Sequence, residues 1–418
     1  MRLDFGFGSA VQSVEVPDQN LLEVLTSNEI PGTLTNEEEV TRALRSPIGT
    51  PRLGEIVRPG EKVAIITSDV TRPVPTWRIL PCVLRELFAS GCRAEDITLV
   101  FALGSHRRHT EEEKRRLAGE WAYERIRCVD SDREDCVRMG VTDRGTPVEI
   151  TRAVAQADRR ICIGNIEYHY FAGYSGGAKA IMPGVSTRGA IQKNHSMMAD
   201  ARCCAGNLDT NPLRQDLEQA AQICDVDFIV NVVLDEHKQI VHAAAGDLIL
   251  AHREGCRFLD RMYLCRIDRR ADIVLVSQGG APKDLNLYQT QKALDNARHA
   301  VRKGGIIILI GSCREGLGEK VFEEWMLSAP NPQSMIERIG REFQLGGHKA
   351  AAIAMTLQHA QIMLVSELED DFVRRIFLEP VHSAQEALDE ALRRLGGEAK
   401  IIAMPYGGST LPRAPGDG

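Results

Sequence analysis

The chain has 418 residues, of which 43% are hydrophobic and 26% are charged. A chain of this length can bury a large core, and we expect roughly two or three domains. Its 51 Lys and Arg residues against 58 Asp and Glu residues give a formal net charge of −7, without a long basic run. This balance disfavours nucleic acid and anionic membranes as partners and favours a small-molecule ligand.

No apolar run approaches the roughly 20 residues of a membrane span, and the opening MRLDFGFGSAVQSVEV lacks the basic start and long apolar centre of a signal peptide. We therefore expect a cytoplasmic protein that does not bind a membrane. The 11 cysteines are an odd number without paired CxxC spacing, which disfavours a disulfide framework and a structural zinc site. Most of them should be buried thiols.

Apolar runs alternate with amphipathic stretches along most of the chain, which is typical of α/β architecture with a mainly parallel sheet. In the first half, buried strands are predicted over 62–70, 96–105, 160–167 and 227–235. Helices are predicted over 76–91, 211–224 and 248–262. The second of these begins with Asn-Pro, a pair that often starts a helix.

In the second half, strands are predicted over 271–280, 304–313, 360–368 and 400–412, and helices over 286–301, 348–360 and 382–397, with further segments around 318–345. Clustered charges break the pattern near 262–271. We therefore predict two Rossmann-like α/β domains with mainly parallel sheets and a cofactor and substrate cleft between them. The N-terminal domain, 1–265, binds cofactor and carries catalysis; the C-terminal domain, 271–400, contributes substrate-binding residues; the tail 405–418 packs back on the first domain.

Ligands of open α/β sheets gather at the carboxyl ends of strands, so the polar residues after each strand are the first candidates. Asp69, Thr71 and Arg72 follow the first strand in a turn stiffened by two prolines. Arg72 could hold a carboxylate or phosphate, and Asp69 could bind a ribose hydroxyl or orient a neighbouring charge. Taken alone, the segment is better explained as a helix start with a surface ion pair.

The loop GSHRRHT after the second strand offers His106 and His109. Thr110 and Glu113 have the spacing of a capping box, so part of this loop serves to start a helix. His106 lies nearest the strand end and is the better candidate for acid/base chemistry. A single loop histidine is nevertheless more often a solvated or hydrogen-bonded side chain than a general base.

The segment HYFAGYSGGAKAIMPG, 169–184, is the most informative stretch of the chain. It combines His169 with glycines, among them Gly176 and Gly177, that permit tight turns and backbone N–H groups aimed at an anion, and with Lys179, a possible nucleophile. It is not a P-loop, because alanines flank Lys179 on both sides, and it lacks GxGxxG. Ordinary nucleotide hydrolysis and ordinary dinucleotide binding are therefore weakly supported.

A helix starting at Ser186 is predicted to carry His195, which alone would more often be a surface residue. Together with His106 and His169 it makes a metal or acid/base cluster plausible. In the second domain, Asn286 is expected to cap a helix whose first turns carry Tyr288, Gln289 and Lys292. Gln289 and Lys292 share a helix face and suit a substrate with hydroxyl and carboxylate groups, although an ordinary solvated face explains them equally well.

These motifs together resemble the lactate racemase family, whose members use a nickel-pincer nucleotide. The resemblance covers most of the chain and rests on SDVTRPVP, ALGSHR, HYFAGYSGGAKAIMPG, KNH and GGAPKDLNLYQTQKA. The cofactor that it implies is a pyridinium-3-thioamide-5-thiocarboxylic acid mononucleotide carrying nickel. Separate cofactor-building enzymes would then be partners in maturation.

The resemblance also implies a role for each matching residue. Lys179 would form the thioamide link to the cofactor, and His195 would complete the nickel coordination. His106 and His169 would be the acid/base pair on opposite faces of the substrate. The remaining positions divide into those near the cofactor, Asp69, Thr71, Arg72, Gly176 and Gly177, and those that hold the substrate, Arg72, Tyr288, Gln289 and Lys292.

The expected activity is that of a racemase or epimerase that inverts C2 of a small 2-hydroxy acid by histidine-assisted hydride transfer through a 2-keto acid. One alternative is a hydroxy acid lyase or dehydrogenase with another metal or nucleotide, to which the missing GxGxxG is the main objection. Another is a non-catalytic maturation protein that binds the cofactor. Such a carrier would need Lys179 and His195 but would have no use for His106 and His169.

Overall fold

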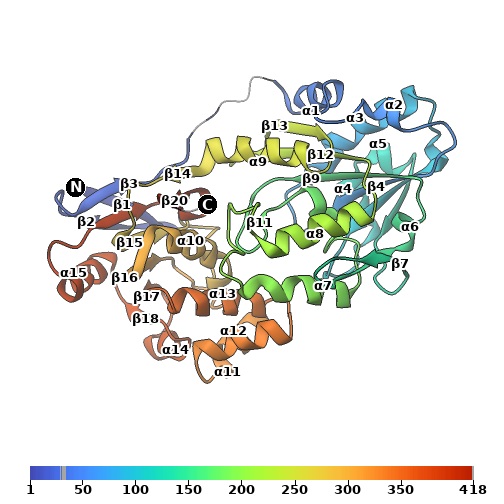
Figure 1. Cartoon of the computed structure of the whole chain (residues 1–418). Coiled ribbons are helices and arrows are strands. Elements are labelled where there is room, and N and C mark those ends of the chain that lie inside the picture. Colours follow the sequence, from blue (N-terminus) through green and yellow to red (C-terminus); the bar gives the residue numbers. More distant parts are fainter. Residues whose placement is uncertain (29, 31–33, 417–418) are drawn as a thin grey trace. The chain divides into compact units, whose positions relative to one another are not determined.

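The computed structural model describes residues 1–28, 30 and 34–416. The chain forms two compact units, Glu29–Arg261 and the combination of Met1–Asn28 with Met262–Gly418 (Figure 1). Each unit contains one six-stranded sheet with helices against it. The prediction of α/β architecture with mainly parallel sheets is confirmed.

The sheet of the unit Glu29–Arg261 has the strand order β13-β12-β9-β4-β5-β6, and only the β12–β13 pair is antiparallel. The chain leaves β4 toward β5 on one side and later returns to β9 on the other. This reversal is a topological switch point, where ligands of such sheets usually bind. The strands are β4 (Val63–Ser68), β5 (Ile97–Ala102), β6 (Arg127–Asp130), β9 (Arg159–Asn165), β12 (Phe228–Leu234) and β13 (Ile240–Gly246).

Helices and short hairpins surround this sheet. Local signals explain several of their starts: Thr110 and Glu113 form the predicted capping box, and Asn211 caps the helix that opens with Pro212. The helices are α1 (Asn36–Arg45), α2 (Leu53–Ile56), α3 (Thr76–Ala89), α4 (Glu111–Ala118), α5 (Glu120–Tyr123), α6 (Arg152–Ala155), α7 (Arg188–His195), α8 (Pro212–Ile223) and α9 (Leu250–Tyr263), with the 3-10 turns η1 (Ala94–Asp96), η2 (Gly177–Ala180) and η3 (Ser196–Ala199). The hairpins pair β7 (Cys136–Val141) with β8 (Pro147–Thr151) and β10 (Tyr168–His169) with β11 (Gly173–Tyr174).

The other unit has the all-parallel order β18-β17-β16-β15-β19-β3. Its strands are β1 (Arg2–Phe7), β2 (Ala10–Glu15), β3 (Leu21–Val24), β14 (Leu264–Arg266), β15 (Ala271–Ser277), β16 (Val301–Ile310), β17 (Gln361–Val365), β18 (Glu379–Val381), β19 (Ile401–Met404) and β20 (Leu411–Arg413). Its helices are α10 (Leu287–Ala300), α11 (Lys320–Ser328), α12 (Pro332–Arg341), α13 (Gly347–Leu357), α14 (Asp370–Arg375) and α15 (Ala384–Leu395), with the 3-10 turn η4 (Gly407–Ser409).

The structure differs from the predicted domain bounds at both ends of the chain. Residues 1–28 belong with the second unit, because β3 pairs in parallel with β19 at the sheet edge (Figure 1). The described part of the tail, up to residue 416, also belongs there, because β20 pairs with β14. Residues 417 and 418 of the predicted tail lie outside the described residues. Both pairings join segments far apart in sequence, which local patterns do not reveal.

All eleven cysteines are free thiols, seven of them buried and four half-buried, as expected for a chain without a disulfide framework. Within the described residues, no helix is both long enough and apolar enough to cross a membrane.

Candidate active site

Nine of the predicted residues lie in the unit Glu29–Arg261, on the segments that follow its central strands. Carboxyl ends of parallel strands meet at one edge of a sheet, so these segments converge at the switch point between β4 and β9. Asp69, Thr71 and Arg72 follow β4, His106 follows β5, His169, Gly176, Gly177 and Lys179 follow β9, and His195 ends α7.

Asp69 and His106 form a close pair across two neighbouring loops. The Asp69 carboxylate lies 2.5 Å from Nδ1 of His106 and accepts a 2.7 Å hydrogen bond from the Thr71 hydroxyl. Asp69 is buried, and burial acts to raise its pKa. The hydrogen bonds from His106 and Thr71 and the charge of Arg72 outweigh burial and hold the pKa below its usual value. Of the two roles predicted for Asp69, the structure supports orientation of a neighbouring group.

The ionised state of Asp69 determines which nitrogen of His106 is available for chemistry. A carboxylate can only accept a hydrogen bond, so Nδ1 of His106 carries a proton and donates it to Asp69. In the neutral ring the lone pair is then on Nε2. With the ring about one-fifth exposed, His106 is arranged as a base at Nε2.

His109, the second histidine of the same loop, has a structural role. Its Nε2 accepts a 3.0 Å hydrogen bond from the Val70 N–H, and its Nδ1 lies 2.7 Å from the Asp130 carboxylate. The ring is buried against Phe101. His109 therefore ties the loop after β5 to the loop after β4 and helps to fix Asp69.

Arg72 offers an exposed positive charge. Its backbone N–H bonds to the Asp69 carbonyl, but its guanidinium forms no hydrogen bond or ion pair with any residue that the structure describes. The surface ion pair that the sequence favoured for this segment is thus not observed. The guanidinium can bind an anionic group of a ligand.

His169 lies in the β10–β11 hairpin and is held by a different set of contacts. Its Nδ1 accepts a 3.3 Å hydrogen bond from the Ala172 N–H. Its ring stacks on Tyr170, with centroids 5.4 Å apart, and meets the edge of Phe171 at 4.5 Å. Because Nδ1 accepts, the neutral ring carries its proton on Nε2. Neutral His169 therefore presents an N–H donor at Nε2, where neutral His106 presents a lone pair.

Two tyrosines and one carboxylate fix the same hairpin to α9. The hydroxyls of Tyr168 and Tyr174 both donate to Oδ1 of Asp260, each at 2.7 Å. These two tyrosines stand opposite each other in the hairpin, so both strands are tied to one point. Asp260 was not among the predicted site residues, because its partners are about 90 residues away in the chain.

Lys179 lies in η2, half-buried, with Nζ 5.6 Å from the centroid of the Phe171 ring. Its amine forms no hydrogen bond or ion pair with the residues described in the structure. Burial, and then the charges of Arg72 and Arg214, hold its pKa well below the usual value. A lowered pKa increases the fraction of unprotonated amine, which is the form that acts as a nucleophile.

Gly176 and Gly177 are required by close packing. Both have positive φ angles, +74° and +56°, and a Cβ at either position would lie 2.7 Å from a neighbouring side chain, that of Asn231 or His252. The expectation that both backbone N–H groups face an anion needs correction. The Gly177 N–H already donates to Oδ1 of Asn231 at 2.6 Å.

His195 is buried at the end of α7 and is oriented by its neighbour. Its Nδ1 lies 3.0 Å from Oδ1 of Asn194, whose amide N–H donates to Asp216 at 2.8 Å. The amide oxygen accepts from Nδ1, which leaves Nε2 as the possible metal ligand. The cap of α7 is Thr187, not Ser186 as predicted, because the Thr187 hydroxyl accepts from the Ala190 N–H while that of Ser186 donates to a carbonyl.

Phe171 joins three of these side chains. Its buried ring contacts His169 at 4.5 Å and His195 at 5.1 Å, and it lies beside Lys179. Phe171 was not among the predicted site residues, although its place between His169 and the glycines was an available signal.

The other three predicted residues, Tyr288, Gln289 and Lys292, lie on α10 in the other unit. Asn286 caps this helix as expected, accepting from the Gln289 N–H at 3.0 Å. The sequence did not point to Lys349, whose ammonium donates to the Tyr288 carbonyl and lies 4.2 Å from the centre of the Tyr288 ring. Tyr288 and Gln289 are half-buried and Lys292 is exposed.

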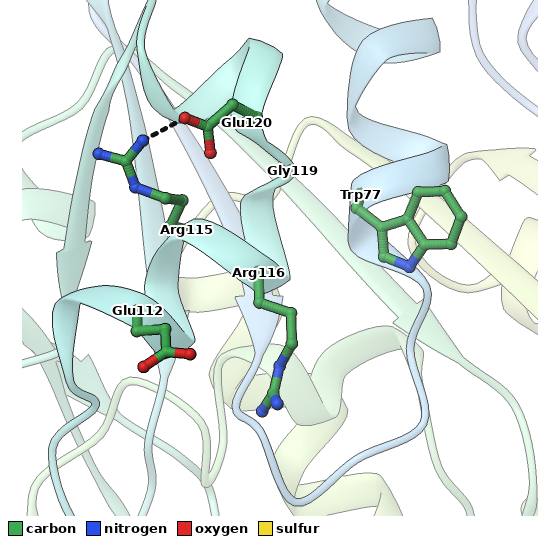
Figure 2. A pocket seen from close by; sticks show the side chains of 6 residues that line it. All are labelled: Trp77, Glu112, Arg115, Arg116, Gly119 and Glu120. Carbon is green, nitrogen blue, oxygen red and sulfur yellow. Dashed lines mark hydrogen bonds and ion pairs between the residues drawn. The ribbon is translucent and has the colours of Figure 1, made fainter.

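A separate surface hollow of about 450 Å³ contains none of the predicted residues. It is formed by α3, α4 and α5 and is lined by Trp77, Glu112, Arg115, Arg116, Gly119 and Glu120. Figure 2 shows the Arg115 side chain pointing toward Glu120, with the Trp77 ring on a neighbouring helix. We assign this hollow no part in the site.

Comparison with known proteins places this arrangement in a family. The model of the lactate racemase N-terminal domain matches residues 7–205, and that of the C-terminal domain matches residues 267–411. The lactate racemase of Thermoanaerobacterium thermosaccharolyticum is 32% identical over 423 residues, covering 98% of this chain and 99% of that protein. The lactate racemase of Lactiplantibacillus plantarum is 32% identical over 418 residues, covering 97% and 98%.

The comparison with solved structures agrees with these sequence matches. The lactate racemase apoprotein from Thermoanaerobacterium thermosaccharolyticum has a TM-score of 0.88 and 32% identity, with 99% of this chain and 100% of that chain covered. A protein from Thermotoga maritima, with a TM-score of 0.63 and 18% identity over 93% of this chain and 100% of its own, shares the fold. The chain therefore belongs to the lactate racemase family and is an isomerase of the racemase type.

Proposed function

We propose that this enzyme inverts C2 of a 2-hydroxy acid, lactate or a larger analogue, with a nickel-pincer nucleotide as cofactor and a 2-keto acid as intermediate. The observation that carries the proposal is the pair of histidines on the segments after β5 and β9, each oriented by a hydrogen bond at Nδ1. A racemase handles a hydroxyl proton on each of two substrate faces, so it needs one group that accepts a proton and one that donates it.

The residues of the chain fit the proposed cofactor. Lys179 would hold it through a thioamide, in which Nζ joins a thiocarboxyl carbon and one water leaves. Only an amine with a free lone pair can form this bond, and the lowered pKa of Lys179 provides it. His195 would offer Nε2 to nickel, a borderline metal that accepts both imidazole and sulfur ligands. Asp69, Thr71, Gly176 and Gly177 would lie beside the cofactor.

The bound cofactor would take the C2 hydrogen as hydride and return it. The protein's own work is proton transfer at the hydroxyl: Nε2 of neutral His106 would remove the proton in one direction, and His169, in its protonated imidazolium form, would supply one on the other face. In the reverse direction the two rings exchange roles. Arg72, whose guanidinium is exposed and has no ion-pair partner in the described part of the chain, would hold the substrate carboxylate.

We assign Tyr288, Gln289 and Lys292 to the substrate on the resemblance to the family. The cofactor-building enzymes are proposed as maturation partners, and the cytoplasm as the location, on the same ground and on the sequence. Fractionation of producing cells would test the location.

The test is co-production with cofactor-building enzymes, followed by intact mass, nickel content and chiral analysis of both lactate enantiomers. We expect an added nucleotide mass on Lys179, about one nickel per chain, and interconversion of the enantiomers. The variant Lys179→Ala should lose all three. Full activity in Lys179→Ala would overturn the proposal.

A double variant, His106→Asn with His169→Asn, separates the enzyme from a cofactor carrier. We expect it to keep the added mass and the nickel while losing turnover. A carrier would show no turnover in the wild type either. An unmodified wild type without nickel, from cells shown to make the cofactor, would favour a lyase or dehydrogenase with another cofactor.

A further inference from the structure

A buried charged cluster lies beneath the turn that carries Lys179, and no sequence motif pointed to it. Its centre is Arg214 on α8, which is fully buried. Arg214 donates to Glu218 at 2.6 Å, and Arg253 on α9 donates to the same carboxylate at 2.7 Å. His252, also fully buried, lies 3.1 Å from the Arg214 guanidinium.

This cluster holds the backbone just before the glycine pair. Arg214 donates to the Tyr174 carbonyl at 3.2 Å, and Nε2 of His252 lies 2.8 Å from the Ser175 carbonyl. A Cβ on Gly177 would stand 3.2 Å from the Arg214 guanidinium. The guanidinium therefore packs directly on the turn, two residues before Lys179.

The cluster contains more positive than negative charge. Glu218 is ionised: burial acts to raise its pKa, but the two arginines outweigh burial and lower it to about 2. His252 is neutral, because burial and the charge of Arg214 hold its pKa well below the usual value. Two guanidinium groups thus face the Glu218 carboxylate, and Asp209 also acts on Arg253. Of these charges, that of Arg214 acts on Lys179.

Lys179 has few other charged neighbours. Arg72, from the loop after β4, and Arg214, from α8, are the charges that act on its amine, and both are positive. The nearby ring of Phe171 is apolar, and burial raises the pKa of the Cys256 thiol beside His252, so that group is neutral as well. No carboxylate among the described residues pairs with the amine.

We propose that Arg214 is a positioning residue for Lys179: it fixes the carbonyl that precedes the Gly176–Gly177 turn and, with its positive charge packed on that turn, favours the neutral, nucleophilic form of the Lys179 amine. The use of that amine rests on the proposed cofactor attachment. The reactivity of the amine can be measured in protein without cofactor. A failure of the role proposed for Arg214 can therefore be distinguished from a failure of the proposed cofactor attachment.

The experiment measures acetylation of Lys179 by limiting acetic anhydride, in apoprotein made without the cofactor-building enzymes, between pH 6 and pH 9. The amine attacks the anhydride carbonyl, an amide N–C bond forms, acetate leaves and one proton goes to the buffer. Peptide mass spectrometry gives the rate for Lys179 relative to the exposed Lys303.

In the wild type we expect Lys179 to react at neutral pH far faster than Lys303. In Arg214→Met the neutral-pH rate should fall by about tenfold or more, with the midpoint moved up by about one pH unit, the change expected when a nearby positive charge is lost. Arg214→Lys, which retains the charge, should keep a midpoint near that of the wild type.

The matched control is Arg160→Met. Arg160 is also buried and also donates to backbone carbonyls, those of Val154 and Ala155, but it does not act on Lys179. It should leave the Lys179 profile unchanged. An unchanged profile in folded Arg214→Met, or an equal shift in Arg160→Met, would overturn the proposal.

If Arg214→Met does not fold, Glu218→Gln gives a test of opposite sign. It removes the negative charge that bonds to both arginines, so the midpoint for Lys179 should stay low or move lower. A midpoint moved up in folded Glu218→Gln would contradict the role assigned to the charge.

Discussion

The loops that carry His106 and His169 hold the same ring in opposite ways. His106 donates from Nδ1 to an ionised carboxylate, whereas His169 accepts at Nδ1 from a backbone N–H. The first ring depends on charge and the second on aromatic stacking and a tied hairpin. The difference shows that the partner at Nδ1 determines which nitrogen of the neutral ring carries the proton.

The largest expected effect comes from removing either ring. His106→Asn and His169→Asn should each lower the racemisation rate by about 10²- to 10⁴-fold, the usual contribution of a general acid or base. Because each inversion needs proton transfer on both faces, loss of either ring should slow interconversion in both directions. Chiral chromatography started from each enantiomer measures this, with retained cofactor mass as the control. Normal rates in both variants would refute the assignment.

The variant Asp69→Asn tests whether the negative charge of Asp69 is needed to orient His106. An amide can still occupy the space but does not hold Nδ1–H of His106 by charge, so we expect kcat to fall by about ten- to hundredfold while cofactor retention is kept. Thr71→Val, which removes only the hydroxyl that bonds to Asp69, should have a smaller effect. Equal effects of the two variants would mean that the carboxylate charge does not matter.

The variant Asp260→Ala tests whether the β10–β11 hairpin, which carries His169, needs its attachment to α9. It removes the acceptor shared by Tyr168 and Tyr174, and we expect a loss of about 1 to 3 kcal/mol in the free energy of unfolding, with kcat lowered less than by Asp69→Asn. Asp260→Asn is the matched control, because its amide oxygen still accepts both hydroxyls. Denaturant unfolding and kcat measure the pair, and identical behaviour of the two variants would show that the hairpin does not need this acceptor.

The smallest expected effect is the contribution of Asp69 to the pH dependence of stability. The pKa of Asp69 is lower in the folded protein than in the unfolded chain, so its stabilising effect is present above the unfolded value of about 4 and is lost as the pH falls through the folded value. Below about pH 4, Asp69→Asn should therefore lose stability less steeply than the wild type. Acid unfolding followed by circular dichroism checks this, and parallel curves would contradict it.

Much of the fold and of the site follows from local sequence. Apolar runs predicted the central strands, and the residues just after them, such as Asp69 and His106, were found because strand ends meet at one edge. What local sequence could not give were partners distant along the chain. The pairing of β3 with β19, the bonds from Tyr168 and Tyr174 to Asp260, and the cluster around Arg214 all join segments tens to hundreds of residues apart.

The tautomers of the two neutral histidine rings could not be predicted from local sequence either. They depend on whether Nδ1 meets a carboxylate or an amide N–H, which is a matter of loop geometry. Gly177 was correctly predicted as part of a tight turn, but its predicted role was not: its N–H donates to Asn231 and is not directed at a ligand.

The central claim is that the histidines act on the hydroxyl proton and that the C2 hydrogen travels as hydride. The most direct test is racemisation of one lactate enantiomer by cofactor-loaded enzyme in D₂O, with the C2 position of the product read by mass spectrometry and NMR. We expect the product enantiomer to keep its protium at C2. Deuterium at C2 would show that a base exchanges that hydrogen with solvent, and would contradict the roles given to His106 and His169.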